Sequence, residues 1–463
     1  MTNLSMDKKR VVIIGGGAAG LSAAYTLKRR GFAPVLLEAA DKVGGRLGGD
    51  EIDGFSLDSG ADFFCSSYDV ALRICDELGL PLLRSKMRLG WYVNGRWVTT
   101  TPGLSFGNLL KNLPPAAALG LLSPRAMWPA VKLFRGIFRD ADYLTFRSDS
   151  RLPELDGKGD FGDYLNGLGA SESLQRTFKG FLEMTLGHVE HSGQAYMRAY
   201  LMEMLVKAHK LQAPAKGASA LGKALADVCS DAIRASTPVR SVVIRDGVAS
   251  GVVVDGATIE ADAVICAVPP ARALELLPHL PDGVRRTLSD ITYSSGIRVV
   301  IGLDRPPLPE GWNGALYPED DTPLMLDRSI NLPAIAPPGK HTLDLMVGRD
   351  RAKELMPLDD EEIKRRLLDD VRGKAPPGSH LPSDDRGGGG LFTRVYRWEE
   401  AVCMGLPGMF GAVAEMRREL GGHVTNLFLA GDYMGVPSVN GALASGVGAA
   451  EQVVELLEST SGN

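Results

Sequence analysis

Three glycines near the start of the chain have the spacing of a dinucleotide-binding turn. Gly15, Gly17 and Gly20 fit the pattern G-x-G-x-x-G, and the acidic residue Glu38 follows downstream. In such a turn the first glycine permits a tight bend, the second lets the backbone approach a pyrophosphate, and the third lets the next helix pack closely. A carboxylate at the position of Glu38 can accept hydrogen bonds from a ribose diol. These residues predict a site for the diphosphate and ribose of a dinucleotide.

The residues around this turn predict the elements that would hold it in place. Val11 to Ile14 is a short apolar, β-branched run, which is typical of a buried parallel strand. Ala18 and Ala19 begin a stretch with helical spacing, so free backbone amides at this helix N-terminus would face the turn. Residues 34–37 form a second apolar run directly before Glu38. Strand, turn, helix and strand predict a complete βαβ dinucleotide site, but this motif does not distinguish FAD from NAD.

The composition of the 463-residue chain limits the class of protein and the kinds of partner that we expect. With 44% hydrophobic and 23% charged residues the chain is an ordinary globular protein, and its length suggests about three domain-sized units. A net charge of −5 argues against nucleic acid as a partner. Five scattered cysteines predict reduced thiols and no metal site. The polar N-terminus leaves no room for a signal peptide, and together these features predict a cytoplasmic protein. No apolar run is long enough for a transmembrane helix.

Two further segments join the first turn in a pattern that resembles a known signature. These are residues 44–46, Gly-Gly-Arg, and residues 58–62, Asp-Ser-Gly-Ala-Asp. With the first turn they resemble the N-terminal FAD signature that flavin amine oxidases, protoporphyrinogen oxidases and phytoene desaturases share. The resemblance implies that Gly60 and Ala61 lie beside the flavin ring. Gly45 would allow a second close approach to the ligand, and Arg46 would face a phosphate oxygen or the flavin's surroundings, with a solvated arginine after a turn as the alternative.

The last part of the chain favours FAD over NAD. A predicted strand runs into Ala-Gly-Asp at residues 430–432, and a helix rich in small residues opens at residues 440–446. Amides at such a helix start can donate to the flavin C2 carbonyl, and the helix dipole favours negative charge on the reduced ring by about 0.3 to 2 kcal/mol. The resemblance also implies that the Val239 backbone hydrogen-bonds the adenine edge. The FAD contacts expected here come from Gly431, Asp432 at the ribityl chain, Val439, Asn440 and Ala442.

The predicted fold is α/β with two discontinuous units. A three-layer, Rossmann-like FAD-binding domain is expected at residues 1–88, 210–285 and 405–463. A substrate-binding domain of mixed sheet with a helical cap is expected at residues 89–209 and 286–404. Within the cap, residues 104–144 are apolar and helical in character with several basic residues. We expect packed helices there, and contact with a membrane surface is the alternative.

The expected substrate pocket lacks a feature of the amine oxidases. In that family two aromatic rings flank the amine; here Ser438 holds the position that matches the second ring, and Met404 falls near the first. Arg298 stands where amine oxidases of the family often carry a lysine. It is either an anchor for a substrate carboxylate or an edge-strand arginine that points to solvent. The other expected pocket residues are Tyr396, Trp398, Met404, Val439 and Asn440.

These features predict an FAD-dependent oxidoreductase that removes hydride from a C–C or C–N centre of a larger apolar substrate, including cyclic ones. The alternatives are an amine oxidase acting on an amine or an amino-acid-derived substrate, a redox-neutral flavin-dependent isomerase, and a flavin-binding protein that does not turn over. Without a second dinucleotide motif, we expect O2, a quinone or another electron acceptor to reoxidise the flavin. Cys403 has the spacing of a cysteine that tethers FAD in some amine oxidases, but its neighbours differ and a free apolar thiol is expected. The sequence does not predict the oligomeric state.

Overall fold

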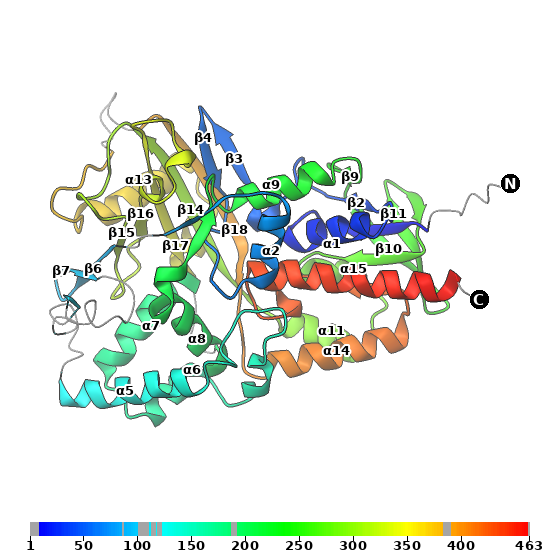
Figure 1. Cartoon of the computed structure of the whole chain (residues 1–463), viewed down its shortest axis with the longest axis horizontal. Helices are drawn as coiled ribbons and strands as arrows, with labels where there is room; N and C mark the ends of the chain where they lie inside the picture. The colour runs from blue at the N-terminus through cyan, green and yellow to red at the C-terminus, as the bar shows by residue number, and fades with distance from the viewer. Residues whose placement is uncertain are drawn as a thin grey trace.

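A computed structural model describes residues 9–85, 88–100, 111–112, 117, 123–186, 192–382 and 390–461 of the chain. The described part has a unit built on a parallel sheet, a unit built on a larger mixed sheet, and a group of helices beside the latter (Figure 1). The predicted α/β fold class is confirmed. The residue limits predicted for the two domains stay a prediction.

The parallel sheet collects strands from three distant parts of the chain. Its order is β19-β13-β1-β2-β9. Ile13 at the centre pairs with Ile265 on one side and with Leu36 on the other. All four residues of β1 are buried, as are those of β13, because parallel strands covered on both faces need continuous apolar runs. The strand bounds are β1 Val11–Ile14, β2 Val35–Leu37, β9 Ile233–Arg234, β13 Ala263–Cys266 and β19 Leu427–Leu429.

Two helices from opposite ends of the chain lie side by side over this sheet. They are α1 (Ala18–Arg29) and α15 (Val439–Ser461), drawn in blue and red in Figure 1. The Ser22 hydroxyl donates to the Leu443 carbonyl at 2.9 Å. A Cβ at Gly446 would come within 2.0 Å of the Ala19 carbonyl oxygen, so only glycine permits this helix contact. A three-stranded antiparallel sheet of β10 (Val239–Arg245), β11 (Val248–Val254) and β12 (Ala257–Glu260) contacts β13.

The second unit is a seven-stranded sheet in the order β18-β14-β17-β16-β15-β6-β7. Its strands pair antiparallel except β15 with β6. An Asn-Gly pair between two aromatic-rich runs predicts a two-residue hairpin, and the structure confirms it, since Asn94 and Gly95 have positive φ, 52° and 72°, as such a tight turn requires. The strand bounds are β6 Leu89–Val93, β7 Arg96–Thr100, β14 Tyr293–Leu303, β15 Gly314–Leu316, β16 Leu324–Leu326, β17 His341–Gly348 and β18 Phe392–Cys403.

Helices between β7 and β8 form the insert beside the larger sheet. In Figure 1 they occupy the lower left of the molecule. Most of residues 101–122, in the first part of the predicted helical stretch, lie outside the described residues. The bounds are α5 Pro124–Arg139, α6 Phe161–Gly167, α7 Glu172–Leu186 and α8 Gln194–Leu201, followed by a π-helical turn at Met202–Val206.

The remaining elements connect these units, and some of them differ from the sequence prediction. The apolar periodicity of residues 220–233 predicts a helix, but α9 ends at Val228, and Ile233 instead joins β9 at the sheet edge. The proline-rich residues 306–338 predict irregular structure, but they contain β15 and β16. The elements not yet given are β3 Gly49–Ile52, β4 Phe55–Asp58, α2 Asp69–Glu77, β5 Leu82–Arg84, β8 Gln212–Pro214, α9 Ser219–Val228, α10 Pro270–Leu276, α11 Asp282–Asp290, α12 Arg349–Leu355, α13 Asp360–Arg372 and α14 Met409–His423.

Among the helices of the described part, none combines the length and the apolar character that crossing a bilayer demands.

Candidate active site

The glycine turn after β1 has the geometry that a dinucleotide requires. Gly15 has a positive φ of 97°, and a Cβ at Gly20 would come within 1.9 Å of the Gly15 carbonyl oxygen. These two positions therefore need glycine for the fold itself. A Cβ at Gly17, by contrast, would meet no heavy atom within 4 Å. The open side of Gly17, at the N-terminus of α1, fits a pyrophosphate held by the helix amides of Ala18 and Ala19.

A second glycine turn joins the first. The Gly44 amide donates to the Gly16 carbonyl at 2.7 Å, and a Cβ at Gly45 would lie 3.3 Å from the Gly17 Cα. At the end of β2, the Glu38 carboxylate accepts from the Gly16 amide at 2.6 Å and from the Ala40 amide at 2.8 Å. The structure thus brings Glu38 and both glycine turns to one edge of the parallel sheet, where ligands bind in such folds.

Arg46 ties this first segment to the last part of the chain. Its guanidinium binds both carboxylate oxygens of Asp432, at 2.8 and 3.1 Å, and lies over the ring of Tyr293. The Tyr293 hydroxyl donates to the same carboxylate at 2.6 Å. Burial alone would lower the pKa of Arg46, but Asp432 and Tyr293 outweigh burial and raise that pKa. Arg46 is therefore not the solvated side chain of the alternative interpretation, and it holds Asp432 at the expected flavin site.

The segment that resembles the flavin-side signature packs directly on Arg46. The Ala61 amide donates to the Arg46 carbonyl at 2.9 Å, and a Cβ at Gly60 would come within 2.7 Å of that oxygen. The indole of Trp398 donates to the Ser59 carbonyl at 2.8 Å. Trp398, an expected pocket residue on β18, thus lies beside the segment of Gly60 and Ala61 that is expected next to the flavin ring.

Beneath this segment lies a buried charge cluster that sequence reasoning identified only in part. We define it as Asp58, Asp62, Arg298, Arg328 and Asp344. Arg298 Nη1 is 2.7 Å from Asp62 Oδ1, and Nη2 bonds Asp344. Asp58 also accepts from the amides of Ala218 and Ser219, at 3.0 and 2.7 Å, so the cluster fixes the start of α9.

Both sequence interpretations of Arg298 need correction. Its side chain is 3% exposed, and β14 lies between β18 and β17, so it is not an edge-strand residue facing solvent. Its two terminal nitrogens are bound to carboxylates of the protein, so the geometry does not support a free anchor for a substrate carboxylate. The sequence does contain a signal for the role of Asp344, which is the single acidic residue in the apolar strand β17. A charge in such a run needs a buried partner of opposite charge.

Asn440 does not face a pocket. Its side-chain oxygen accepts from the amides of Val70 and Ala71, each at 3.0 Å, and its nitrogen donates to Asp69 and to the Phe146 carbonyl. These bonds use the whole amide group to attach α15 to the start of α2. The prediction that the Asn440 side chain is catalytic is therefore wrong.

The other predicted pocket residues differ in their surroundings. The Tyr396 hydroxyl donates to Asp50 at 2.8 Å, and its ring packs in an apolar cluster with Phe55 and Leu57, so it serves the β3–β4 hairpin. Met404 is buried, and the ring of Tyr196 packs on the backbone of the adjoining Gly405. Tyr196, which the sequence analysis did not identify, donates to the Pro437 carbonyl at 3.0 Å and so approaches the segment before α15.

The remaining predicted FAD contacts lie near the ends of strands and helices. The Gly431 amide donates to the Ser445 hydroxyl at 2.9 Å, and Val439 and Ala442 are in the first turn of α15. Val239 begins β10, and its carbonyl accepts from Arg272 at 3.1 Å. Contact of Val239 with adenine stays a prediction. In the part of the chain that the structure describes, no three His, Cys, Asp or Glu side chains are placed to hold a metal ion.

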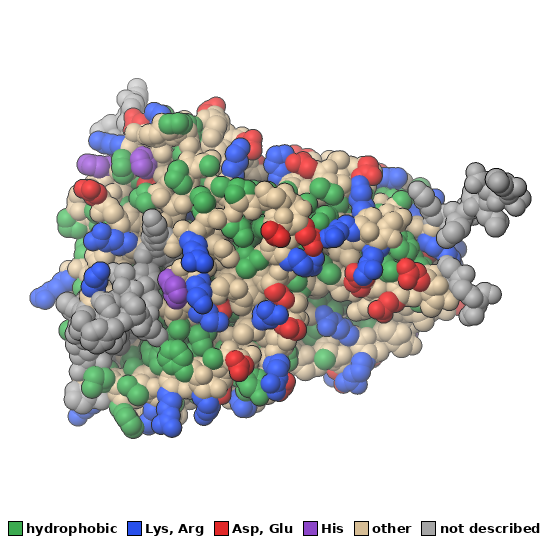
Figure 2. Space-filling view, viewed as in Figure 1, with side chains coloured by type: hydrophobic (Ala, Val, Ile, Leu, Met, Phe, Trp, Pro, Cys, Tyr) green, Lys and Arg blue, Asp and Glu red, His purple; other side chains and the backbone are tan. Residues whose placement is uncertain are grey.

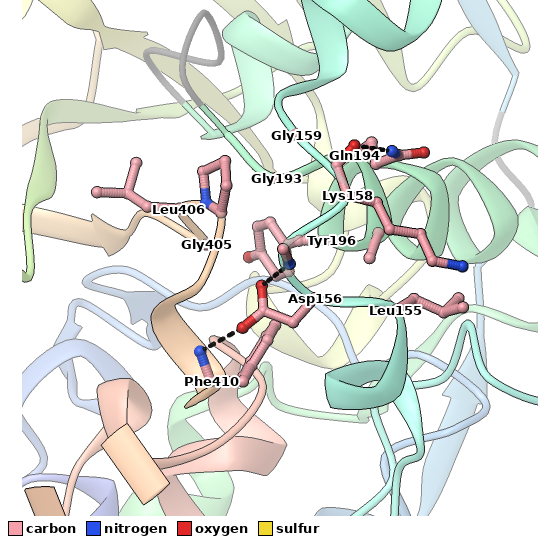
Figure 3. A pocket seen from close by; sticks show the side chains of 13 residues that line it. Leu155, Asp156, Lys158, Gly159, Gly193, Gln194, Tyr196, Gly405, Leu406 and Phe410 are labelled. Carbon is pink, nitrogen blue, oxygen red and sulfur yellow. Dashed lines mark hydrogen bonds between the residues drawn. The ribbon is translucent and has the colours of Figure 1, made fainter. Parts of the chain in front are cut away.

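A shallow pocket lies between the helical insert and residues 405–410 (Figure 3). It encloses no room for a ligand, whereas ligand sites usually have about 300 to 1,000 Å³. Across it, Asp156 accepts from the amides of Gly408 at 2.8 Å and Phe410 at 2.9 Å, which caps the start of α14. We interpret this pocket as a junction between the insert and the segment that leads into α14.

Comparison with known proteins agrees with this geometry. The family model described as flavin containing amine oxidoreductase matches residues 18–454. A protein of Mycobacterium tuberculosis named as a flavin-containing monoamine oxidase is 28% identical over 58% of this chain and 60% of its own length, so the chain matches about three fifths of that relative. Coproporphyrinogen III oxidase of Bacillus subtilis is 23% identical over 94% of this chain and 96% of its own.

Among solved structures, a protein from Exiguobacterium named as a protoporphyrinogen oxidase superposes with a TM-score of 0.74 at 22% identity, covering 98% of this chain and 100% of that one. This likeness confirms the fold. The family match spans nearly the whole sequence and includes Gly20, Glu38, the second glycine turn at residues 44–45 and the Arg46–Asp432 pair. The chain therefore belongs to the flavin-containing amine oxidoreductase family, with FAD as its cofactor.

Proposed function

We propose that this protein removes hydride from a C–C or C–N centre of an apolar small molecule, in the manner of a desaturase or a porphyrinogen oxidase. The observation that carries the proposal is the pair Met404 and Ser438, since Ser438 stands where the resembled amine oxidases place one aromatic ring and Met404 falls near the place of the other. Aromatic faces stabilise a bound protonated amine through cation–π attraction, whereas an apolar ring system is bound better by a buried thioether and other apolar side chains.

The surroundings of both positions support this interpretation. Ser438 accepts from the Gly441 amide at 2.9 Å and donates to the Val436 carbonyl at 3.0 Å, so its hydroxyl serves as a helix cap. Met404 is buried beside Gly405, on which the Tyr196 ring lies. These contacts support an apolar substrate side at the expected flavin position.

In this proposal the side chains of the chain position the substrate and exclude water. When bound, FAD supplies the two-electron acceptor, and O2, a quinone or another acceptor receives the electrons afterwards. Trp398 and Met404 would contact the substrate, while Arg298 would act as a positioning residue that holds Asp62 and, through it, the segment at Gly60. The name of the Bacillus relative supports a reduced tetrapyrrole as the first candidate.

A second candidate is oxidation of an amine, which the name of the mycobacterial relative favours. The two functions predict different substrates for the same reductive half-reaction. Each can therefore be tested by mixing the oxidised holoprotein with substrate in the absence of oxygen.

The experiment follows the flavin absorbance band under anaerobic conditions. We expect bleaching by a reduced porphyrinogen and none by a monoamine or a polyamine. Trp398→Phe is expected to slow the bleaching with FAD still bound, whereas Trp312→Phe, in an aromatic cluster with Trp97, serves as the matched control. Bleaching by amines alone would support the second candidate. Conversion of a substrate to a product of equal mass without net bleaching would overturn both in favour of a redox-neutral isomerase.

A further inference from the structure

Helix α5 of the insert exposes an unusual set of large apolar side chains. Met127, Trp128, Val131 and Phe138 are 48%, 63%, 50% and 51% exposed. Elsewhere in the described residues the exposed large hydrophobic side chains are Val228, Val248, Ile330 and Leu391, which stand in four separate segments. Apolar exposure is therefore concentrated on one helix.

These side chains are not needed to pack the helix. Ala126, Leu133 and Ile137 on the opposite face are fully buried and attach α5 to the insert. At about 100° per residue, Met127, Val131 and Phe138 fall within about 40° of one another around the helix axis. These three side chains form a second stripe, with Trp128 about 60° further around the helix, and no residue that the structure describes covers them.

A row of cations lies beside this stripe. Arg125, Lys132, Arg135 and Arg139 are all exposed, and α5 itself contains no acidic residue. Arg125 and Arg135 form no ion pair with any residue that the structure describes, whereas Arg139 pairs with Asp140 at 2.8 Å. Lys132 lies 5.9 Å from the centre of the Trp128 ring. Figure 2 shows apolar and basic side chains together along the lower left edge, over α5. This local positive charge contrasts with the net charge of −5 of the whole chain.

We propose that α5 docks the protein on an anionic lipid surface, with the helix axis parallel to the membrane. The apolar stripe would enter the boundary between headgroups and acyl chains, and the cations would contact lipid phosphates. A second copy of the chain fits this face poorly, because a symmetric contact would place the two rows of cations against each other. This inference does not depend on the proposed reaction.

The test is flotation of the FAD-loaded protein with vesicles. We expect binding to phosphatidylcholine vesicles that contain about one third phosphatidylglycerol, weak binding to phosphatidylcholine alone, and loss of binding as salt rises from about 50 to about 500 mM. The double variant Arg125→Glu/Arg135→Glu is expected to weaken binding by at least about tenfold, since each surface cation is worth about fivefold. The triple variant Trp128→Ser/Val131→Ser/Phe138→Ser should also lose binding, by removing the inserted area.

Two control variants match these changes on the other unit. Arg240→Glu/Arg286→Glu reverses two exposed charges, and Val228→Ser/Val248→Ser removes two exposed apolar side chains. Both should bind vesicles as the parent does, and all variants should retain FAD absorbance as evidence of folding. The proposal is overturned if the parent does not float with anionic vesicles or if the α5 variants float equally well. A dimer in solution that the triple variant abolishes, without vesicle binding by the parent, would instead assign this face to a second copy.

Discussion

Replacement of Arg298 by methionine tests the buried charge cluster at its centre. The guanidinium is 3% exposed and binds Asp62 and Asp344, which are also buried. Methionine has a similar length but no charge, so Asp58, Asp62 and Asp344 would keep only Arg328 as an opposite charge. Removing one partner of a buried ion pair destabilises a protein by about 3 to 5 kcal/mol, because the remaining charge stays buried.

This free energy converts to a measurable shift in melting temperature. The entropy of unfolding is about 2.1 cal/mol/K per residue, which gives about 1 kcal/mol/K for 463 residues unfolding as one unit. We therefore expect Arg298→Met to lower Tm by about 3 to 5 °C, measured by flavin fluorescence during heating of the holoprotein. Arg365→Met on α13 is the control, since its ion pairs are half exposed and should contribute less than about 1 kcal/mol.

The pH dependence of the Tm difference provides a second test of the buried charge cluster. Burial raises the pKa of Asp344 even though Arg298 and Arg328 lower it, and loss of Arg298 should raise this pKa further. A carboxyl whose pKa is higher in the folded state stabilises the fold when protonated, and that contribution is lost as pH rises through the folded pKa. The Tm difference between Arg298→Met and the parent should therefore be widest near neutral pH and shrink on acidification. An unchanged Tm, or a difference that grows toward acid pH, would refute the reasoning.

Three further predictions concern the cofactor site and its supports. Gly17→Val should fold with an unchanged Tm of the apo-protein, because a Cβ at Gly17 meets no protein atom. It should purify with little FAD, as seen in its absorbance spectrum, because the new side chain occupies the expected ligand side. Gly20→Ala should instead impair folding, since its Cβ would lie 1.9 Å from the Gly15 carbonyl oxygen. Asn440→Ala leaves two buried amides unsatisfied and should destabilise the protein by about 2 to 6 kcal/mol in thermal melts, with Asn440→Asp less affected. Burial and the nearby Asp432 raise the pKa of the Cys403 thiol, which disfavours a reactive thiolate. Acid precipitation should leave the yellow colour in the supernatant, and colour in the pellet would contradict this.

The parallel-sheet unit was predictable because its signals are local. β1, the glycine turn, α1 and β2 are consecutive, and each short run carries its own pattern of apolar residues or glycines. The hairpins at Asn94 and Asp246 were predictable for the same reason, since their turn residues prefer positive φ. β15 and β16, by contrast, have three residues each and lie in a proline-rich stretch, so only pairing with neighbouring strands defines them.

The candidate site was predictable residue by residue but not as a set of contacts. Arg46 and Asp432 were each identified as flavin-site residues, yet they are 386 positions apart, and their ion pair follows only from the fold. The role of Asn440 was mistaken for the same reason, because Val70 and Ala71 reach it from the start of α2. Charge alone could not show that both terminal nitrogens of Arg298 are bound within the protein, since Asp62 and Asp344 come from different parts of the chain.

The strand order of the parallel sheet has a consequence for biosynthesis. β1 emerges from the ribosome first, but its neighbour β13 follows some 250 residues later and β19 near residue 427. Until β13 and β19 have been synthesised, the nascent chain carries apolar strands that lack one of their pairing partners. Pairing of strands so far apart in the sequence is slow. We expect ribosome-bound fragments that stop before Leu427 to remain sensitive to protease and to associate with chaperones, and FAD to be acquired only after release.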